Sequence, residues 1–197
     1  MGTKGNKLPG EVYSQDELNA LLAQCSRRAP TGIRDRAMLT VVWRCGLRIS
    51  EALDLTVPDI DVKRGTVTVM HGKNDKRRVV GIGDGALAVL QLWLDCRKNL
   101  GLARKGTPVF CTLKGTRMFH QHVDQMLKRR AAKAGIEKRA HLHGLRHSYA
   151  VELATREPVA IVQQALGHKH LTTTAIYLDH LSPEGVIAAG RADPWTG

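Results

Sequence analysis

The sequence lacks long apolar runs. No stretch reaches the roughly 18 consecutive apolar residues that a membrane-spanning helix needs, and residues 1–10, MGTKGNKLPG, lack the apolar centre of a secretion signal. The cysteines are scattered and form no C-x-x-C pair, which is typical of reduced thiols rather than a disulfide framework. We therefore expect a cytoplasmic protein with no membrane association.

Internal repeats and low-complexity segments are also absent. Hydrophobic residues make up 43% of the 197 residues, an ordinary share for a soluble globular protein. This composition argues against wholesale disorder. The length predicts a single domain that is large enough to bury a core.

Acidic residues are few relative to basic ones. The chain has 18 Asp and Glu against 30 Lys and Arg, which gives a net charge of +12. A basic protein of this size is often a nucleic-acid binder, because phosphate contacts supply most non-specific affinity. The basic residues concentrate in 63–78 and 128–139, and the alternative is that both segments are simply solvated faces. The candidate DNA contacts from these segments are Lys76, Arg77, Arg78, Lys128, Arg129, Arg130 and Lys133.

Hydrophobic periodicity predicts a mostly helical fold with one small antiparallel sheet. Ser14 and Glu17 form the capping-box pattern that opens a helix, and two β-branched runs around the polar turn GKNDK predict a β-hairpin within 64–83. A helix containing 33–41 is expected to end at Gly46, and the next one to begin near Ser50. Further predicted elements are an extended segment at 107–112 and helices at about 84–100, 120–135, 144–156, 158–166, 172–180 and 182–191.

The segment HLHGLRHSYA, residues 141–150, combines three histidines with one arginine. His143 and His147 are four apart, as in some zinc-binding helices, but the fixed cation of Arg146 lies between them and no further ligand follows at a suitable spacing. His143 and Arg146 are three apart and share one helix face, where a guanidinium binds phosphate and an imidazole moves a proton. This anion site is favoured over a metal site, although an ordinary surface pair of His and Arg remains an alternative.

Three other segments carry side chains suited to phosphate chemistry. Arg48 lies at a predicted helix start with Glu51 one turn later, and Lys73 lies at the tip of the predicted hairpin. His168 follows a helix in the sequence LGH, and Tyr177 comes nine residues later. Each has an ordinary explanation: a surface ion pair, a solvated turn lysine or a packed tyrosine. Their joint occurrence in this order is what makes them candidates.

These segments together resemble the signature of the tyrosine recombinases, also called phage-type integrases. The similar segments are GLRISEAL, HGKNDKRR, HLHGLRHSYA and ALGHKHLTTTAIYLDH, and the separation of His168 from Tyr177 is also like that of the family. The resemblance extends from about Tyr13 to Leu181. It implies the catalytic-domain fold of that family and a site-specific DNA recombinase of the integrase or invertase type.

The resemblance implies a role for each phosphate-binding residue. Arg48 and Arg146 would hold the non-bridging oxygens of the scissile phosphate and stabilise the charge of the transition state. His168 would donate a hydrogen bond to the same oxygens. Glu51 would support the site by positioning Arg48.

The resemblance also implies the nucleophile and the proton transfers. Tyr177 would attack phosphorus and form a 3′-phosphotyrosine with release of a 5′-hydroxyl. His143 would accept the tyrosine proton, Lys73 would protonate the leaving oxygen, and His147 would be structural. Because the phosphotyrosine conserves the energy of the broken bond, no cofactor, ATP or metal is required.

The resemblance divides the chain into three parts. Residues 1–12 would be a basic tail, 13–181 the catalytic domain, and 182–197 a C-terminal helix that packs on a neighbouring subunit. Family members usually carry a helical domain before this one, so the chain is either an excised catalytic domain or a short stand-alone recombinase. The implied partners are double-stranded DNA, further copies of the chain in a tetrameric synapse, and accessory DNA-bending proteins.

Two alternatives to a recombinase stay open. A type IB topoisomerase uses the same phosphotyrosine chemistry but relaxes supercoils without sequence preference. A catalytically silent DNA-binding regulator would keep the fold and would never form a covalent adduct with DNA.

Overall fold

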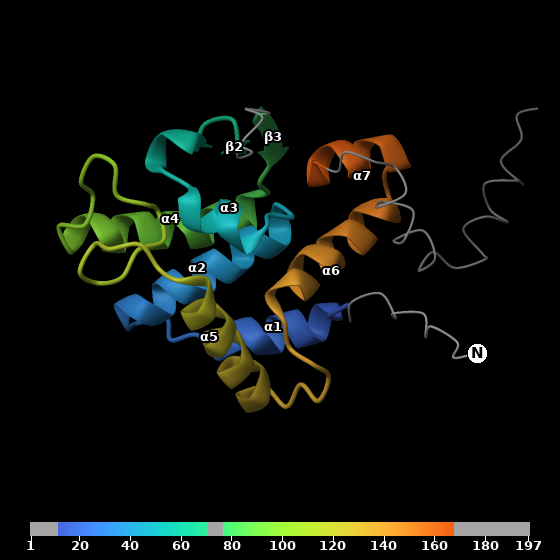
Figure 1. Ribbon diagram of the computed structural model, residues 1–197, viewed down its shortest axis with the longest axis horizontal. Coiled ribbons are helices and arrows are strands. Elements are labelled where there is room, and N and C mark those ends of the chain that lie inside the picture. The colour runs from blue at the N-terminus through green and yellow to red at the C-terminus, as the bar shows by residue number, and fades with distance from the viewer. Residues whose placement is uncertain (1–11, 71–76, 168–197) are drawn as a thin grey trace, which may run out of the picture.

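The computed structural model describes residues 12–70 and 77–167, and this part is mostly helical. Figure 1 shows the helices grouped around α2 with a small sheet at one end. The elements in chain order are α1 (Gln15–Ala23), α2 (Pro30–Arg44), α3 (Ile49–Asp54), the 3-10 helix η1 (Val57–Asp59), β1 (Ile60–Asp61), β2 (Thr66–Met70), β3 (Arg77–Gly81), α4 (Asp84–Asn99), α5 (His120–Lys133), α6 (Leu142–Ala154) and α7 (Val159–Leu166). The predicted fold class, mostly helical with a small antiparallel sheet, is confirmed.

Helix α2 is the centre of the fold. It contacts α1, α3, α4 and α6, and its residues from 37 to 43 are all buried. Trp93 of α4 is fully buried and donates from Nε1 to the carbonyl oxygen of Val109 at 2.8 Å. This bond fixes the segment after α4, which was predicted to be extended, against the core. Helix α2, helix α4 and the segment that follows α4 therefore belong to one packed core.

The sheet is antiparallel with the strand order β1-β2-β3. Val67 pairs with Val80, and both side chains are buried, so these positions define the inner face. Because side chains alternate between faces along a strand, Arg78 lies on the same inner face as Val80, while Arg77 and Val79 lie on the outer face. The predicted hairpin is present, and β1 is an additional short strand that the sequence pattern did not predict.

The starts of α1 and α6 are each fixed by a side chain that caps the first turn of the helix. The predicted capping box at α1 is confirmed: Ser14 Oγ accepts from the backbone N–H of Glu17 at 3.2 Å, and Glu17 Oε2 accepts from that of Ser14 at 2.7 Å. Helix α6 begins at Leu142, earlier than the predicted residue 144. The reason is that Nδ1 of His141 accepts from the backbone N–H of Gly144 at 3.0 Å and caps the helix.

Helix α7 packs back against α6 and β3, as Figure 1 shows. Val162 and Leu166 form a small buried cluster with Ala150 of α6. This packing brings the C-terminal end of α7 to the inner face of the hairpin. The helices predicted at 172–180 and 182–191 lie outside the described residues. Within the described part of the chain, no helix combines the length and hydropathy that crossing a bilayer demands.

Candidate active site

A sharp turn after α2 begins the site. Gly46 adopts a left-handed conformation with φ of +60°, and a Cβ atom there would lie 2.3 Å from Cδ1 of Tyr149. Only glycine therefore fits this turn without displacing the tyrosine ring. The carbonyl oxygen of Gly46 points to Arg146 and accepts from its Nη1 at 2.7 Å. The turn thus links the start of α3 to α6.

The carboxylate of Glu51 is the centre of an arginine cluster. Arg48 donates to Glu51 through its backbone N–H at 2.8 Å and through Nη1 at 2.9 Å. Arg78 contacts both carboxylate oxygens, with Nη1 at 3.0 Å from Oε1 and Nη2 at 2.7 Å from Oε2. Arg146 Nη1 lies 3.8 Å from Oε2. We call Arg48, Glu51, Arg78 and Arg146 the Glu51 cluster; it joins α3, β3 and α6.

The surrounding arginines keep Glu51 ionised. Burial alone raises the pKa of Glu51, but the hydrogen bond and charge of Arg78, the backbone N–H of Arg48 and the charge of Arg146 together lower it to about 2. The cluster consequently contains one anion and three cations at neutral pH. This excess of positive charge is what an anionic ligand such as a phosphate group requires.

The arginines of the cluster differ in exposure. The side chain of Arg146 is 1% exposed and its Nη2 donates to the carbonyl oxygen of Leu166 at 2.6 Å, whereas that of Arg48 is 41% exposed. Arg146 therefore joins the end of α7 to the turn at Gly46. Arg48 offers a guanidinium that Glu51 orients and that solvent or a ligand can reach.

His143 lies on the exposed side of the same region. Burial and the nearby charges of Arg146, His141 and Arg48 lower the pKa of His143 below its ordinary value of 6.5. Its ring meets that of His147 edge to face, with the centroids 4.2 Å apart. At neutral pH His143 is thus largely the neutral imidazole, the form that accepts a proton. Among the described residues, no group of three or more His, Cys, Asp and Glu side chains could hold a metal ion.

Three of the six residues to which the resemblance gives catalytic roles lie together in the described chain: Arg48, His143 and Arg146. The positions of Lys73, His168 and Tyr177 fall outside the described residues, as does the candidate DNA contact Lys76. Helix α7 ends at Leu166 with Gly167 as its left-handed cap, one residue before His168. The described part of the site therefore leads directly to the segment that carries the last two candidates.

The candidate DNA contacts divide into two groups by their surroundings. Four of them are exposed: Arg77, Lys128, Arg129 and Lys133. Arg78 and Arg130 instead make internal bonds, since the side chain of Arg78 is 8% exposed on Glu51 and that of Arg130 is 19% exposed on Asp35. Arg130 also donates from Nη1 to the carbonyl oxygen of Gln24 at 2.6 Å. The sequence indicated both arginines as candidate DNA contacts, and the structure shows both side chains bonded to carboxylates within the protein.

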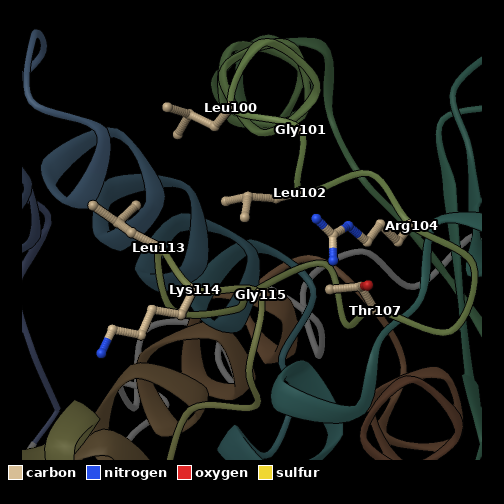
Figure 2. A pocket seen from close by; sticks show the side chains of 8 residues that line it. All are labelled: Leu100, Gly101, Leu102, Arg104, Thr107, Leu113, Lys114 and Gly115. Atoms are coloured by element: carbon tan, nitrogen blue, oxygen red, sulfur yellow. The ribbon is translucent and has the colours of Figure 1, made fainter.

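A separate hollow of about 320 Å³ lies beyond the end of α4. Figure 2 shows Arg104 and Thr107 on one side of it and Leu113 and Lys114 on another, with Leu102 between them. No residue of the Glu51 cluster lines this hollow. The phosphate-binding candidates and this pocket are thus two different places on the molecule.

The fold is that of the catalytic domains of tyrosine recombinases. In a comparison with protein families, residues 11–183 match the phage integrase family, and the chain belongs to that family. The resemblance inferred from the sequence is confirmed.

Individual relatives agree with this assignment. The chain is 37% identical to a tyrosine recombinase XerD of Pseudomonas aeruginosa over 88% of this chain and 58% of the relative, and 34% identical to a XerC of Alcanivorax borkumensis over 88% and 56%. It thus spans less than two thirds of the length of these relatives.

Solved structures agree as well. The crystal structure of XerA recombinase matches with a TM-score of 0.80 at 27% identity, over 96% of this chain and 67% of the other. The post-cleavage complex of XerH with palindromic difH matches with a TM-score of 0.78 at 30% identity, over 98% and 55%. The catalytic domain of bacteriophage HP1 integrase has the same fold, with a TM-score of 0.66 over 96% and 98%.

Proposed function

We propose that this chain is the catalytic part of a site-specific tyrosine recombinase. The Tyr177 oxygen attacks a DNA phosphorus atom, the bond from phosphorus to the 5′-oxygen breaks, and the products are a 3′-phosphotyrosine and a 5′-hydroxyl. Attack of a new 5′-hydroxyl on the phosphotyrosine restores the phosphodiester and frees the tyrosine. The number of phosphate ester bonds is unchanged, so the reaction proceeds without ATP or a metal ion.

The observation that carries this proposal is the Glu51 cluster beside His143. A buried carboxylate orients an exposed guanidinium, Arg48, and a neutral imidazole lies near the same cations. Preoriented guanidinium groups stabilise the charge that develops on the phosphate oxygens without reorganisation at the moment of reaction. Of the two arginines assigned to the phosphate, Arg48 is already accessible to it. Arg146 binds the same phosphate after its guanidinium exchanges its carbonyl partners for phosphate oxygens.

The remaining roles in the proposal concern protons. An unperturbed tyrosine has a pKa near 10, so Tyr177 needs a base at neutral pH. His143 accepts this proton because its lowered pKa keeps it neutral. Lys73 protonates the leaving 5′-oxygen, and His168 donates a hydrogen bond to the phosphate. Glu51 acts only through the arginines that it holds.

The proposed partner is double-stranded DNA. A relative of 30% identity, XerH, has been solved as a complex with its difH substrate, and the net charge of +12 suits a polyanion. Arg77, Lys128, Arg129 and Lys133 are the exposed candidates for backbone contacts, and Lys76 joins them from outside the described residues. The protein acts in the cytoplasm as a tetrameric synapse, with accessory DNA-bending proteins supporting the assembly.

The proposal gives residues 182–197 a role between subunits. Deletion of this segment, which lies outside the described residues, is expected to lower recombination between two sites while leaving single-strand cleavage unchanged. Gel assays of both products on the same DNA measure the two activities. Equal loss of both would contradict a role confined to subunit contact.

The test of the proposal is covalent trapping. A pool of nicked suicide duplexes with randomised arms is incubated with the chain in EDTA and without ATP, and denaturation-resistant adducts are captured. The expected result is a 3′-linked adduct with the wild-type chain and none with Tyr177→Phe. DNA binding without any adduct would favour the silent regulator. Relaxation of any supercoiled plasmid without site preference would favour the topoisomerase.

A further inference from the structure

Arg78 is bonded entirely within the protein in the contacts that the structure records. Its Nη1 and Nη2 contact the two oxygens of Glu51, and its Nε donates to the carbonyl oxygen of Ala165 at 3.0 Å. All three nitrogens of the guanidinium are therefore engaged. The side chain is 8% exposed, so it presents almost no surface to a DNA backbone.

The two contacts of Arg78 have different consequences. The bidentate pair with Glu51 fixes both carboxylate oxygens in a plane, and each of these oxygens also meets another arginine: Oε1 meets Nη1 of Arg48 and Oε2 lies near Nη1 of Arg146. Loss of Arg78 would free the carboxylate to rotate. The orientation of Arg48, the exposed phosphate candidate, thus depends on Arg78 through Glu51.

The second contact concerns the end of α7. The last carbonyl groups of a helix have no hydrogen-bond donor within it. Here Arg78 donates to the carbonyl oxygen of Ala165, and Arg146 donates to that of Leu166. Two adjacent cations also oppose the partial negative charge of the helix C-terminus. Because α7 ends at Leu166, two residues before His168, the bond from Arg78 holds the last turn of the helix that leads to that segment.

From these contacts we propose that Arg78 is a positioning residue of the phosphate site: it holds Glu51 and the C-terminal end of α7 and does not bind DNA phosphate itself. This inference rests on the proposed recombinase function for its catalytic consequence. The structural part, a link from strand β3 through Glu51 to Arg48 and Arg146, is independent of that function.

The first experiment does not require activity. The Nε–Hε resonances of Arg48 and Arg146 are recorded by NMR in the wild-type chain, in Arg78→Gln and in Arg156→Gln. Arg156 is a suitable control because it carries the same charge at 63% exposure and pairs only with Glu152 among the ion pairs recorded for it. Both resonances are expected to shift in Arg78→Gln and to stay in place in Arg156→Gln. Unchanged resonances in Arg78→Gln would overturn the proposal, whether or not the chain cleaves DNA.

The second experiment separates binding from chemistry. On the suicide duplexes, Arg78→Gln is expected to reduce the rate of adduct formation at saturating DNA by about tenfold or more, the size of a lost charged hydrogen bond. The Kd and its salt dependence are expected to match those of wild type, because no phosphate contact is removed. Loss of a phosphate contact would instead reduce the magnitude of the slope of log K against log salt by about 0.9 and leave the rate of adduct formation unchanged. That result would overturn the proposal.

A conservative variant guards against misfolding. Arg78→Lys keeps the charge but lacks the planar fork that spans both oxygens of Glu51 and the carbonyl of Ala165. It is expected to fold, to bind DNA with the wild-type Kd, and to form adduct at least about fivefold more slowly. A wild-type rate in this variant would overturn the positioning role. If the wild-type chain itself forms no adduct, the proposed function fails, and the NMR comparison still decides the role of Arg78.

Discussion

Among the described residues, two buried carboxylates, Glu51 and Asp35, are each bonded to more than one arginine, and the two clusters differ in whether an arginine stays accessible. Glu51 holds Arg48, Arg78 and Arg146, and Arg48 remains 41% exposed beside His143. Asp35 holds Arg34 at 2.7 Å and Arg130 at 2.5 Å, and both guanidinium groups are largely covered. We call Arg34, Asp35 and Arg130 the Asp35 cluster.

The Asp35 cluster is a clamp between α2 and α5. Each of its arginines also donates to a backbone carbonyl oxygen, Arg34 to that of Cys111 at 3.2 Å and Arg130 to that of Gln24 at 2.6 Å. Its titratable neighbour is the buried thiol of Cys25, whose pKa burial raises to about 11. An arginine–carboxylate cluster is thus a candidate for catalysis only where an oriented guanidinium stays accessible and a group able to move a proton lies beside it.

Removal of the Asp35 carboxylate is expected to produce the largest change in the free energy of unfolding. Asp35→Ala leaves the guanidinium groups of Arg34 and Arg130 buried without their anion, which is expected to lower the free energy of unfolding by about 3–5 kcal/mol. Urea denaturation followed by tryptophan fluorescence measures this loss. The folded fraction is expected to form adduct at the wild-type rate. A loss below about 1 kcal/mol would show that the Asp35 cluster is not a structural clamp.

The next effect is on chemistry rather than stability. Arg48→Ala removes the exposed guanidinium and is expected to slow adduct formation by about 10²–10³-fold, as loss of one transition-state donor does. Because Arg48 is partly exposed, the free energy of unfolding is expected to change by less than about 1 kcal/mol. Single-turnover cleavage and urea denaturation of the same preparation measure both. Cleavage within about twofold of wild type would contradict the assigned role.

Acid stability tests the ionisation of Glu51. The folded-state pKa of Glu51 is lowered from 4.5 to about 2, so its ionisation stabilises the folded state fully above pH 4.5 and this contribution is lost as the pH falls toward 2. The shift corresponds to about 3 kcal/mol. Between pH 5 and 2, the free energy of unfolding, measured by urea denaturation at each pH, is expected to fall less steeply with decreasing pH for Glu51→Gln than for wild type. Parallel curves for the two proteins would contradict this pKa.

The smallest expected change is in DNA binding, and it differs between the neighbouring residues Arg129 and Arg130 of α5. Arg129 is exposed, so Arg129→Gln is expected to weaken DNA binding a few-fold and to reduce the slope of log K against log salt by about 0.9, with stability unchanged. Arg130→Gln is expected to leave the slope unchanged and to destabilise the fold, because Arg130 belongs to the Asp35 cluster. Titrations at several salt concentrations measure the slopes. Equal slopes for the two variants would remove the distinction between an exposed and an internal arginine.

Much of the fold could be read from the sequence because its signals are local. Ser14 and Glu17 satisfy each other's backbone within one helical turn, and the alternation around Val67 and Val80 needs only a strand and its neighbour. Strand β1 has two residues, too few for any alternation to appear. The start of α6 was missed because His141 is an uncommon cap whose role depends on its tautomer.

The sequence predicted which residues belong to the candidate site, but it did not predict the hydrogen bonds and ion pairs between them. The positions of Arg48, His143 and Arg146 follow from motifs, and the structure brings the two arginines together at Glu51 with His143 near them. The partner of Arg78 lies 27 residues away and that of Arg130 lies 95 away, so no local pattern reveals either pair. One signal was available: Arg78 is two residues from the buried Val80, and strand alternation places both on the inner face.

In the proposed reaction, the Glu51 cluster neutralises charge on a DNA phosphate. The most direct measurement compares Arg48→Ala on two duplexes from the trapping pool, one with a normal scissile phosphate and one in which a methylphosphonate replaces it. A methylphosphonate lacks the negative charge that the guanidinium would stabilise, so the variant is expected to approach the wild-type rate on that duplex while remaining about 10²–10³-fold slow on the normal one. An equal loss on both duplexes would contradict the claim.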